Sequence, residues 1–161
     1  MKKLFFVLLT LCFASCFLHP DLDSTTTHVY FKNETAHEIA ILYYYPKDGT
    51  REVDTLRVAP GSTLEKVNWD SREANFAVAS TSDYGRYVCD SAQVVFDGNY
   101  RVSRYLNSPA DSANKHYSNS SLRNIFNEKS YDISGKDVTK RRREVTYIYT
   151  FIDPGYVYAS Q

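Results

Sequence analysis

Nucleophilic chemistry in this chain of 161 residues would have to come from Cys89. A cysteine nucleophile needs a histidine to take its proton, and the candidate bases are His28, His37 and His116. No recognised catalytic motif contains these residues, and Cys89 follows Val88 in a run that has the pattern of a strand. The sequence therefore favours Cys89 as a small buried hydrophobic residue, and a cysteine-dependent hydrolase is the least favoured function.

The histidines and glycines of the chain lack the spacing that metal-binding and cofactor-binding sites require. His19, His28, His37 and His116 are scattered without the paired spacing of a zinc site. The six glycines stand singly at turns, so no glycine-rich loop is present to hold a phosphate group. We therefore expect no catalytic residues, no metal site and no cofactor, and predict that the chain is not an enzyme.

A compact basic run covers residues 140–143. Arg141 and Arg142 could bind the carboxylate or phosphate groups of an acidic glycan or a lipid head group. The alternative, which the sequence favours, is a solvated strand edge, where basic side chains discourage edge-to-edge aggregation. Because the formal net charge of the whole chain is +0, no nucleic-acid partner is expected.

Tyrosine is the most conspicuous residue type, with 14 copies. Strand alternation directs Tyr44 to the face opposite Tyr43 and Tyr45, so one of these faces must meet either a second sheet or a ligand. Tyr44 and Trp69 are therefore candidate residues of a stacking platform for a sugar or peptide. Core packing of the rings is the favoured alternative.

The N-terminal residues have the pattern of an export leader. Lys2 and Lys3 precede the uninterrupted apolar run of residues 4–13, and small residues follow. Even if the run is extended to residue 18 it holds fifteen residues, whereas a membrane-spanning helix needs about twenty. We therefore predict a cleaved leader rather than a transmembrane anchor.

The string Phe13-Ala14-Ser15-Cys16 resembles the bacterial lipobox. The resemblance covers these four residues and the leader, and it departs from the family in having Phe13 where leucine is usual. It implies cleavage before Cys16 and attachment of lipid to the Cys16 thiol, which would anchor the chain firmly to a membrane. Phe17, rather than aspartate, follows the cysteine, which implies the outer membrane; the resemblance leaves open whether the domain faces the periplasm or the cell surface.

Four short triplets resemble the Asp-Ser/Thr-apolar O-glycosylation site of exported Bacteroidota proteins. Their candidate acceptor residues are Ser24, Thr55, Ser91 and Ser112. Ser112 is the favoured acceptor because it lies in a long loop. The alternative is that these Asp-Ser and Asp-Thr pairs form turns.

Short runs of β-branched and aromatic residues recur about every ten residues, with turn residues between them. The pattern predicts strands over residues 28–33, 38–45, 52–59, 63–69, 74–80, 91–96, 100–105 and 143–152. Pro60-Gly61 predicts a type II turn, and Asp97-Gly98-Asn99 predicts a hairpin.

Residues 106–142 form a gap between strands that is far longer than ordinary loops. The only ordered element predicted in it is a short helix over residues 121–131, where Leu122, Ile125 and Phe126 have helical spacing behind a serine cap. We interpret the rest of this gap as either functional or mobile.

These elements predict an all-β fold, a β-sandwich of about 7–9 strands with one short helix. The C-terminal run of residues 147–151 (YIYTF) resembles the small lipoproteins of Bacteroidota, which implies an immunoglobulin-like or transthyretin-like sandwich. The expected organisation is a signal peptide over residues 1–15, a lipidated cysteine and flexible tether over 16–27, and a single domain over 28–161.

The sequence thus favours a non-enzymatic, membrane-anchored binding or adhesion module of the cell envelope. Its expected partners are the membrane, through lipid on Cys16, and a peptide, glycan or envelope protein. An alternative class is a structural or accessory subunit of an outer-membrane complex, which would dock a partner by strand addition.

Overall fold

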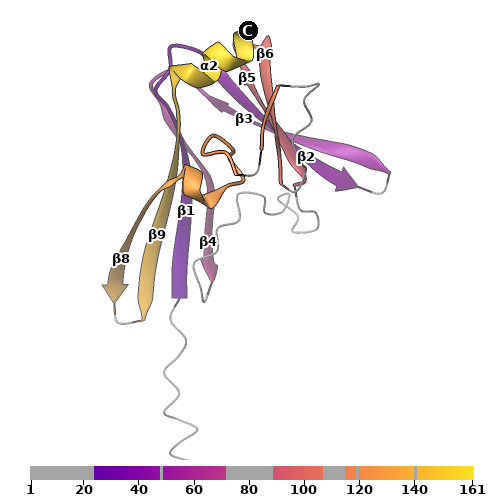
Figure 1. Ribbon diagram of the computed structural model, residues 1–161. Helices are drawn as coiled ribbons and strands as arrows, with labels where there is room; N and C mark the ends of the chain where they lie inside the picture. The colour runs from indigo at the N-terminus through magenta and orange to yellow at the C-terminus, as the bar shows by residue number, and fades with distance from the viewer. Residues whose placement is uncertain (1–23, 48, 72–88, 107–114, 119, 140) are drawn as a thin grey trace, which may run out of the picture.

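A computed structural model describes residues 24–47, 49–71, 89–106, 115–118, 120–139 and 141–161. These residues form two β-sheets that pack against each other, with one short helix after the last strand (Figure 1). The predicted all-β architecture is confirmed, and the arrangement is that of a β-sandwich. The predicted strand over residues 74–80, the leader and Cys16 lie outside the described residues.

One sheet has four strands in the order β4-β1-β9-β8. Its strands are β1 (Ser24–Asn33), β4 (Thr63–Ser71), β8 (Asp132–Thr139) and β9 (Arg142–Phe151). β1 is antiparallel to β4 but parallel to β9, so that Ser24 pairs with Arg142 and Asn33 pairs with Phe151. The first residues of β1 and β9 therefore lie at the same end of the sheet.

The other sheet has five strands in the order β3-β2-β5-β6-β7. Its strands are β2 (Ile39–Lys47), β3 (Thr50–Val58), β5 (Ser91–Phe96), β6 (Tyr100–Tyr105) and β7 (His116–Tyr117). Adjacent strands are antiparallel except β6 and β7, which are parallel. Both sheets are therefore mixed.

Two predicted turns are confirmed by backbone geometry. Gly61 has φ +69°, and the Ser62 N–H donates to the Ala59 carbonyl at 3.1 Å, as a type II turn over Pro60-Gly61 requires. Asp97 and Gly98 both have positive φ, 49° and 74°, which is the requirement of a type I′ hairpin turn between β5 and β6.

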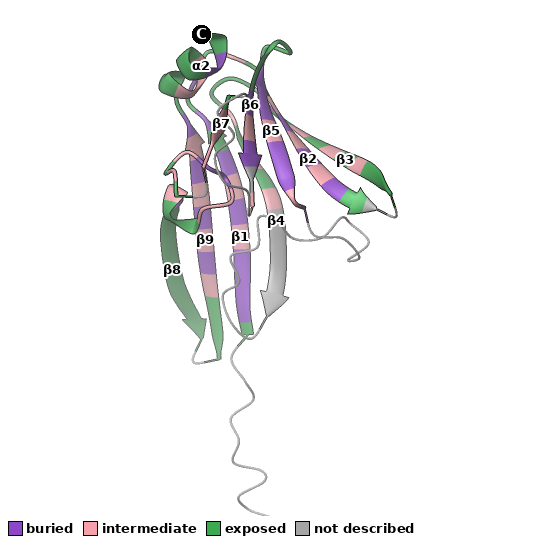
Figure 2. Ribbon diagram, turned by 45° about the vertical axis from the view of Figure 1, so that its right-hand side comes forward, coloured by how far each residue is buried: buried purple, intermediate pink, exposed green. Residues whose placement is uncertain are grey.

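Buried residues recur along the strands of both sheets (Figure 2), and many of those in the core are aromatic. Strand β9 shows the expected alternation, because Val145, Tyr147, Tyr149 and Phe151 are buried while the residues between them are partly exposed. In β2, Tyr43 and Tyr45 are buried on the inner face in the same way. Strands β9 and β2 thus each contribute one side of an alternating pattern to the core.

The structure differs from the sequence prediction in residues 106–142. This stretch contains strands β7 and β8 as well as the 3₁₀ helix η1 (Glu128–Ser130). All eight residues of β8 are exposed, so the strand has no buried apolar side to reveal it in the sequence. The first strand also starts earlier than predicted, at Ser24, inside the segment expected to be tether.

The predicted helix over residues 121–131 is a series of turns that ends in η1. The Asn124 side chain accepts the Phe126 N–H at 3.0 Å, and the Asn127 side chain accepts the Lys129 N–H at 3.1 Å. These local bonds replace the backbone bonds of an α-helix. Among the described residues, the one short α-helix is instead α2 (Asp153–Ser160), which has a proline in its first turn.

Residues 120–131 lie between the two sheets and complete the core (Figure 1). Ile125 is fully buried, and the Tyr131 hydroxyl donates to its carbonyl at 2.7 Å. From β9, the Tyr149 hydroxyl donates to the Arg123 carbonyl at 2.8 Å. The segment is thereby fixed against the four-stranded sheet.

Asn33, the last residue of β1, joins the two sheets where the chain crosses between them. Its fully buried side chain donates to the carbonyls of His37 at 2.8 Å and Val58 at 3.0 Å. The side-chain oxygen accepts both the backbone N–H and the hydroxyl of Thr35, at 3.0 and 2.8 Å. One amide therefore fixes the end of β1, the approach to β2 and the end of β3.

We predict that Asn33→Ala lowers the free energy of unfolding by about 2–4 kcal/mol, because it leaves several buried backbone groups without partners, each at about 1–3 kcal/mol. Urea denaturation followed by circular dichroism measures the change. The matched control is Asn99→Ala, an exposed asparagine of the β5–β6 turn, for which a change within about 0.5 kcal/mol is expected. Equal losses in both variants would contradict the role given to Asn33.

Candidate functional site

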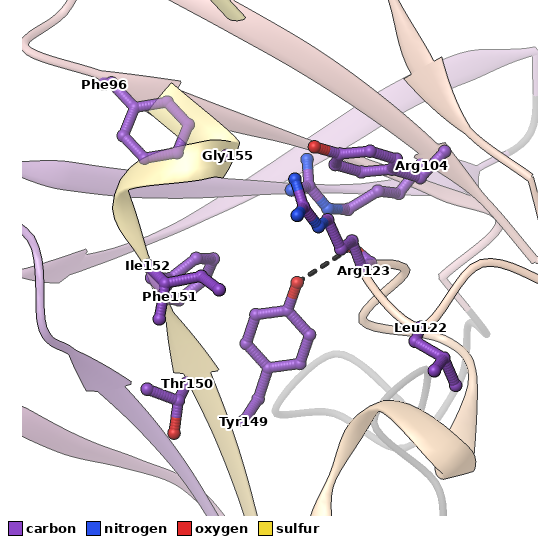
Figure 3. Close-up of a pocket in the computed structure, with 10 residues that line it drawn as sticks. Phe96, Arg104, Leu122, Arg123, Tyr149, Thr150, Phe151, Ile152 and Gly155 are labelled. Atoms are coloured by element: carbon purple, nitrogen blue, oxygen red, sulfur yellow. Dashed lines mark hydrogen bonds between the residues drawn. The ribbon is translucent and has the colours of Figure 1, made fainter. Parts of the chain in front are cut away.

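A cavity of about 240 Å³ lies near α2, between the two sheets. Its walls come from the ends of β5 and β9, from β6 and β7, from residues 122–123 and from α2 (Figure 3). The lining residues are Phe96, Arg104, Tyr117, Leu122, Arg123, Tyr149, Thr150, Phe151, Ile152 and Gly155. The cavity thus combines two arginines with a mainly aromatic and aliphatic wall.

Arg104 reaches this cavity because of the alternation of β6. Val102 and Arg104 stand two residues apart and therefore share the inner face, while Arg101 is exposed on the outer face. Arg104 is 1% exposed and heads the fully buried side chains of the described residues when these are ranked by volume. A permanently charged group thus occupies a core position.

Among the described residues, Arg104 meets no group of opposite charge. Its Nη1 donates to the Val102 carbonyl at 2.6 Å, and its Cζ lies 5.0 Å from the centre of the Tyr117 ring. Its buried Nε has no hydrogen-bond partner, and no carboxylate of the described residues forms an ion pair with it. A buried charge without a counter-ion costs several kcal/mol, of which a cation–π contact recovers about 2.

Phenol groups surround this charge. The Tyr117 hydroxyl is buried and, like Arg104 Nε, has no hydrogen-bond partner. The Tyr149 hydroxyl points toward the side of the pocket that carries Arg104 and Arg123 (Figure 3). Burial raises the pKa of Tyr149, and the positive charge of Arg104 and a hydrogen bond from its side chain partly oppose that rise. Tyr149 therefore stays neutral at physiological pH and supplies no counter-charge.

The remainder of the wall is apolar. Phe96 from β5, Phe151 at the end of β9 and the side chains of Leu122 and Ile152 provide most of it. A cationic and hydroxyl-bearing end next to an apolar end is an arrangement that orients a small ligand. The chemistry that these residues offer is recognition of a negative group attached to an apolar body.

Tyr44 and Trp69 do not line this cavity. Tyr44 lies opposite Tyr43 and Tyr45 on β2, as predicted, and its hydroxyl donates to the Gln93 side chain at 3.0 Å. The Arg51 guanidinium lies 5.7 Å from the Tyr44 ring centre. Trp69 belongs to β4 of the four-stranded sheet, where it pairs with Thr27 of β1. The structure therefore places the two candidate platform residues on different sheets.

Arg141 and Arg142 lie at the turn between β8 and β9. The Ser24 N–H donates to the Arg141 carbonyl at 2.8 Å, so this turn adjoins the first residue of β1. Arg142 Nη2 lies 3.8 Å from a Glu144 oxygen, and a 3.0 Å bond from Lys136 lowers the pKa of Glu144. The basic turn is exposed, at the opposite end of β9 from the cavity.

The candidate glycosylation residues occupy different environments. Ser91 is buried, and its hydroxyl donates to the Asp90 carboxylate at 2.6 Å, so a transferase cannot reach it in the folded protein. Thr55 on β3 and Ser24 at the start of β1 are exposed. Ser112 lies outside the described residues.

Cys89 has the environment of a buried structural thiol. It is fully buried, its Sγ donates to the Ser91 carbonyl at 3.0 Å, and burial raises its pKa to about 11. His28 pairs instead with Glu65 at 2.9 Å, and His37 pairs with Asp97 at 2.6 Å. A protonated, inaccessible thiol is a poor nucleophile, and neither of these histidines is placed to activate it.

Within the part of the chain that the structure describes, no three histidine, cysteine or acidic side chains come together as metal ligands. In the same residues, no helix combines the length and the apolar character needed to cross a membrane. Comparison of the chain with protein-family models, curated proteins and solved structures finds no match.

Arg104 and Tyr117 are not among the site residues predicted from the sequence. A signal for Arg104 was present, because residues 100–105 were predicted as a strand and Val102 on its core face implies Arg104 on the same face. No comparable signal pointed to Tyr117, which lies in the two-residue strand β7.

We predict that the free energy of unfolding falls as the pH rises from 9 to 11. The unfolded Cys89 thiol loses its proton near its ordinary pKa of 9.0, whereas the folded thiol keeps it to about 11. A shift of this size amounts to about 2–3 kcal/mol of lost stability. Urea denaturation under reducing conditions at pH 8, 9.5 and 11 measures it.

The control for this pH series is Cys89→Ala, which lacks the titrating thiol. The stability difference between the two proteins should shrink steadily from pH 8 to pH 11, since the buried tyrosines titrate in both. A constant difference, or rapid labelling of the native Cys89 by a thiol reagent at pH 8, would contradict the assignment of a buried thiol with a raised pKa.

Proposed function

We propose that the chain is an exported lipoprotein, anchored to the outer membrane by lipid on Cys16, that acts as a non-enzymatic binding module of the cell envelope. The leader and the lipobox-like string before Cys16 support the anchor. The described strand β1 begins at Ser24, and seven residues, 17–23, stand between it and Cys16 in the sequence. A lipid on Cys16 would therefore hold one end of β1 close to the membrane.

The position of the cavity is the observation that carries this proposal. Ser24 stands at one end of β1, and Asn33 at the other end pairs with Phe151, which lines the cavity. Nine residue steps at about 3.3 Å separate these ends by about 30 Å. α2, whose Gly155 lines the cavity, lies at the far end of the four-stranded sheet from Ser24 (Figure 1). In this proposal the cavity therefore lies at the end of the domain that is far from the anchor.

The basic turn supports the same orientation. Arg141 and Arg142 adjoin Ser24 and therefore lie at the membrane end. Each basic residue close to an anionic surface contributes about 1 kcal/mol of attraction. In this proposal Arg141 and Arg142 contact lipid head groups, and the cavity rather than the basic run takes the ligand. The finer fold type, immunoglobulin-like or transthyretin-like, belongs to the same proposal and is supported by the two packed sheets.

We predict that Cys16→Ser moves the protein from the membrane to the soluble fraction, because no lipid can be attached. Phase partitioning in detergent and mass spectrometry of the N-terminal peptide measure the change. Cys12→Ser is the matched control and should stay lipidated. An unlipidated Cys16 in the native protein would overturn the proposed anchor.

A second candidate function, a subunit of an envelope complex, is favoured by the edge strand β8. Its eight residues are all exposed, and Ile133 and Val138 expose 54% and 45% of their surface. An exposed edge strand with apolar side chains offers both backbone and side-chain contacts to a strand of another protein.

The subunit hypothesis predicts that Ile133→Asp releases a protein that co-purifies from detergent-solubilised membranes. The matched control is Val53→Asp, on the edge strand β3 of the other sheet, where 48% of the valine surface is exposed. Retention of the partner by Ile133→Asp, or equal loss in both variants, counts against docking on β8.

A further inference from the structure

We propose that the cavity near α2 binds a small monocarboxylate with an apolar or aromatic body, and that Arg104 and Tyr117 hold the carboxylate. This inference rests on the proposed function as a binding module and names the ligand class of its site. It is carried by two buried polar groups on one wall, Arg104 Nε and the Tyr117 hydroxyl, neither of which has a hydrogen-bond partner.

The buried guanidinium calls for an anion. Native proteins rarely leave a buried donor without a partner or a buried cation without a counter-charge. The Val102 carbonyl accepts from Nη1 of Arg104, the Tyr149 hydroxyl also hydrogen-bonds to the Arg104 side chain, and the Tyr117 ring contacts the guanidinium through its face rather than through its hydroxyl. The buried Nε–H of Arg104 therefore remains as a donor to an acceptor in the cavity.

A carboxylate fits this edge better than a phosphate does. A carboxylate is planar, carries one negative charge, and matches the planar donor edge of a guanidinium. One fully buried cation neutralises that single charge, and the Tyr117 hydroxyl supplies a further donor. A phosphate dianion would bring a second charge, for which only the partly exposed Arg123 is available on the wall.

The rest of the cavity wall determines the polarity and size of the part of the ligand that lies beyond its carboxylate. Phe96, Leu122 and Phe151 present aromatic and aliphatic surface beside the polar end. The volume of about 240 Å³ is below the range of about 300–1,000 Å³ that drug-sized ligands occupy. The body is therefore a single ring or a short alkyl chain, as in phenylacetate or octanoate.

The test is isothermal titration calorimetry of the detergent-solubilised full-length lipoprotein with four probes: phenylacetate, octanoate, phenylacetamide and inorganic phosphate. We expect at least one carboxylate to bind at least about tenfold more tightly than phenylacetamide, since a hydrogen bond to a charged group is worth about that factor. Phosphate should bind more weakly than that carboxylate.

Two variants locate the carboxylate. Tyr117→Phe removes one hydroxyl but keeps the ring over Arg104, and it should weaken carboxylate binding about fivefold without lowering the thermal stability of the unliganded protein. Arg104→Met should weaken it about 50-fold. The matched controls are Tyr30→Phe, on β1 of the other sheet, and Arg101→Met, which alter residues outside the cavity wall and should leave the affinity within about twofold.

Three results would overturn the inference: no binding of either carboxylate, equal binding of phenylacetate and phenylacetamide, or tighter binding of phosphate. An unchanged carboxylate affinity in the stable Tyr117→Phe variant would also overturn the inference, because that result is expected if the Tyr117 hydroxyl does not contact the ligand. The proposed lipid anchor is tested separately, by mass spectrometry of the peptide that contains Cys16. A wrong ligand class and a wrong membrane anchor therefore give different experimental results.

Discussion

The buried amide of Asn33 fixes the corner on which the sandwich depends. Around this residue the chain leaves β1, enters β2, and meets the ends of β3 and β9, so that one side chain and its neighbouring backbone groups link both sheets. The Glu34 N–H donates to the Phe151 carbonyl at 3.0 Å, and the Asn33 N–H donates to the Ser62 carbonyl at 2.8 Å. The cavity lies next to this corner, since Phe151 lines it. The hydrogen bonds around Asn33 therefore also help to set the distance between the walls of the cavity.

The sequence predicted those elements whose signals are local. The turn at Pro60-Gly61, the hairpin at Asp97-Gly98 and the alternation of β9 each depend on a few neighbouring residues, and all three are found. Strand β8 and the turns of residues 121–131 depend instead on contacts with other segments. β8 pairs with β9, and asparagine side chains hydrogen-bond to backbone groups of the turns. Such contacts leave no periodic pattern in the sequence, so the sequence alone could not predict these elements.

The candidate site was missed for a related reason. The binding residues predicted from the sequence included the exposed Arg142 and the half-buried Tyr44, whereas the cavity uses a charge from the inner face of β6. A strand prediction already implied that Arg104 shares a face with Val102. What the sequence could not supply is that β7 and residues 122–123 meet this face, because that proximity arises only when both sheets and the segment between them are assembled.

The parallel pairing of β1 with β9 has a consequence for folding. Ser24 and Arg142 are neighbours in space but 118 positions apart in the sequence. The four-stranded sheet therefore cannot form until β9 has been synthesised, and closing so long a loop costs entropy before any contact of the pair offsets it. High contact order of this kind slows folding. The four-stranded sheet is therefore the last part of the sandwich that can assemble, and a lipoprotein exported as proposed would complete it only after β9 has crossed the membrane.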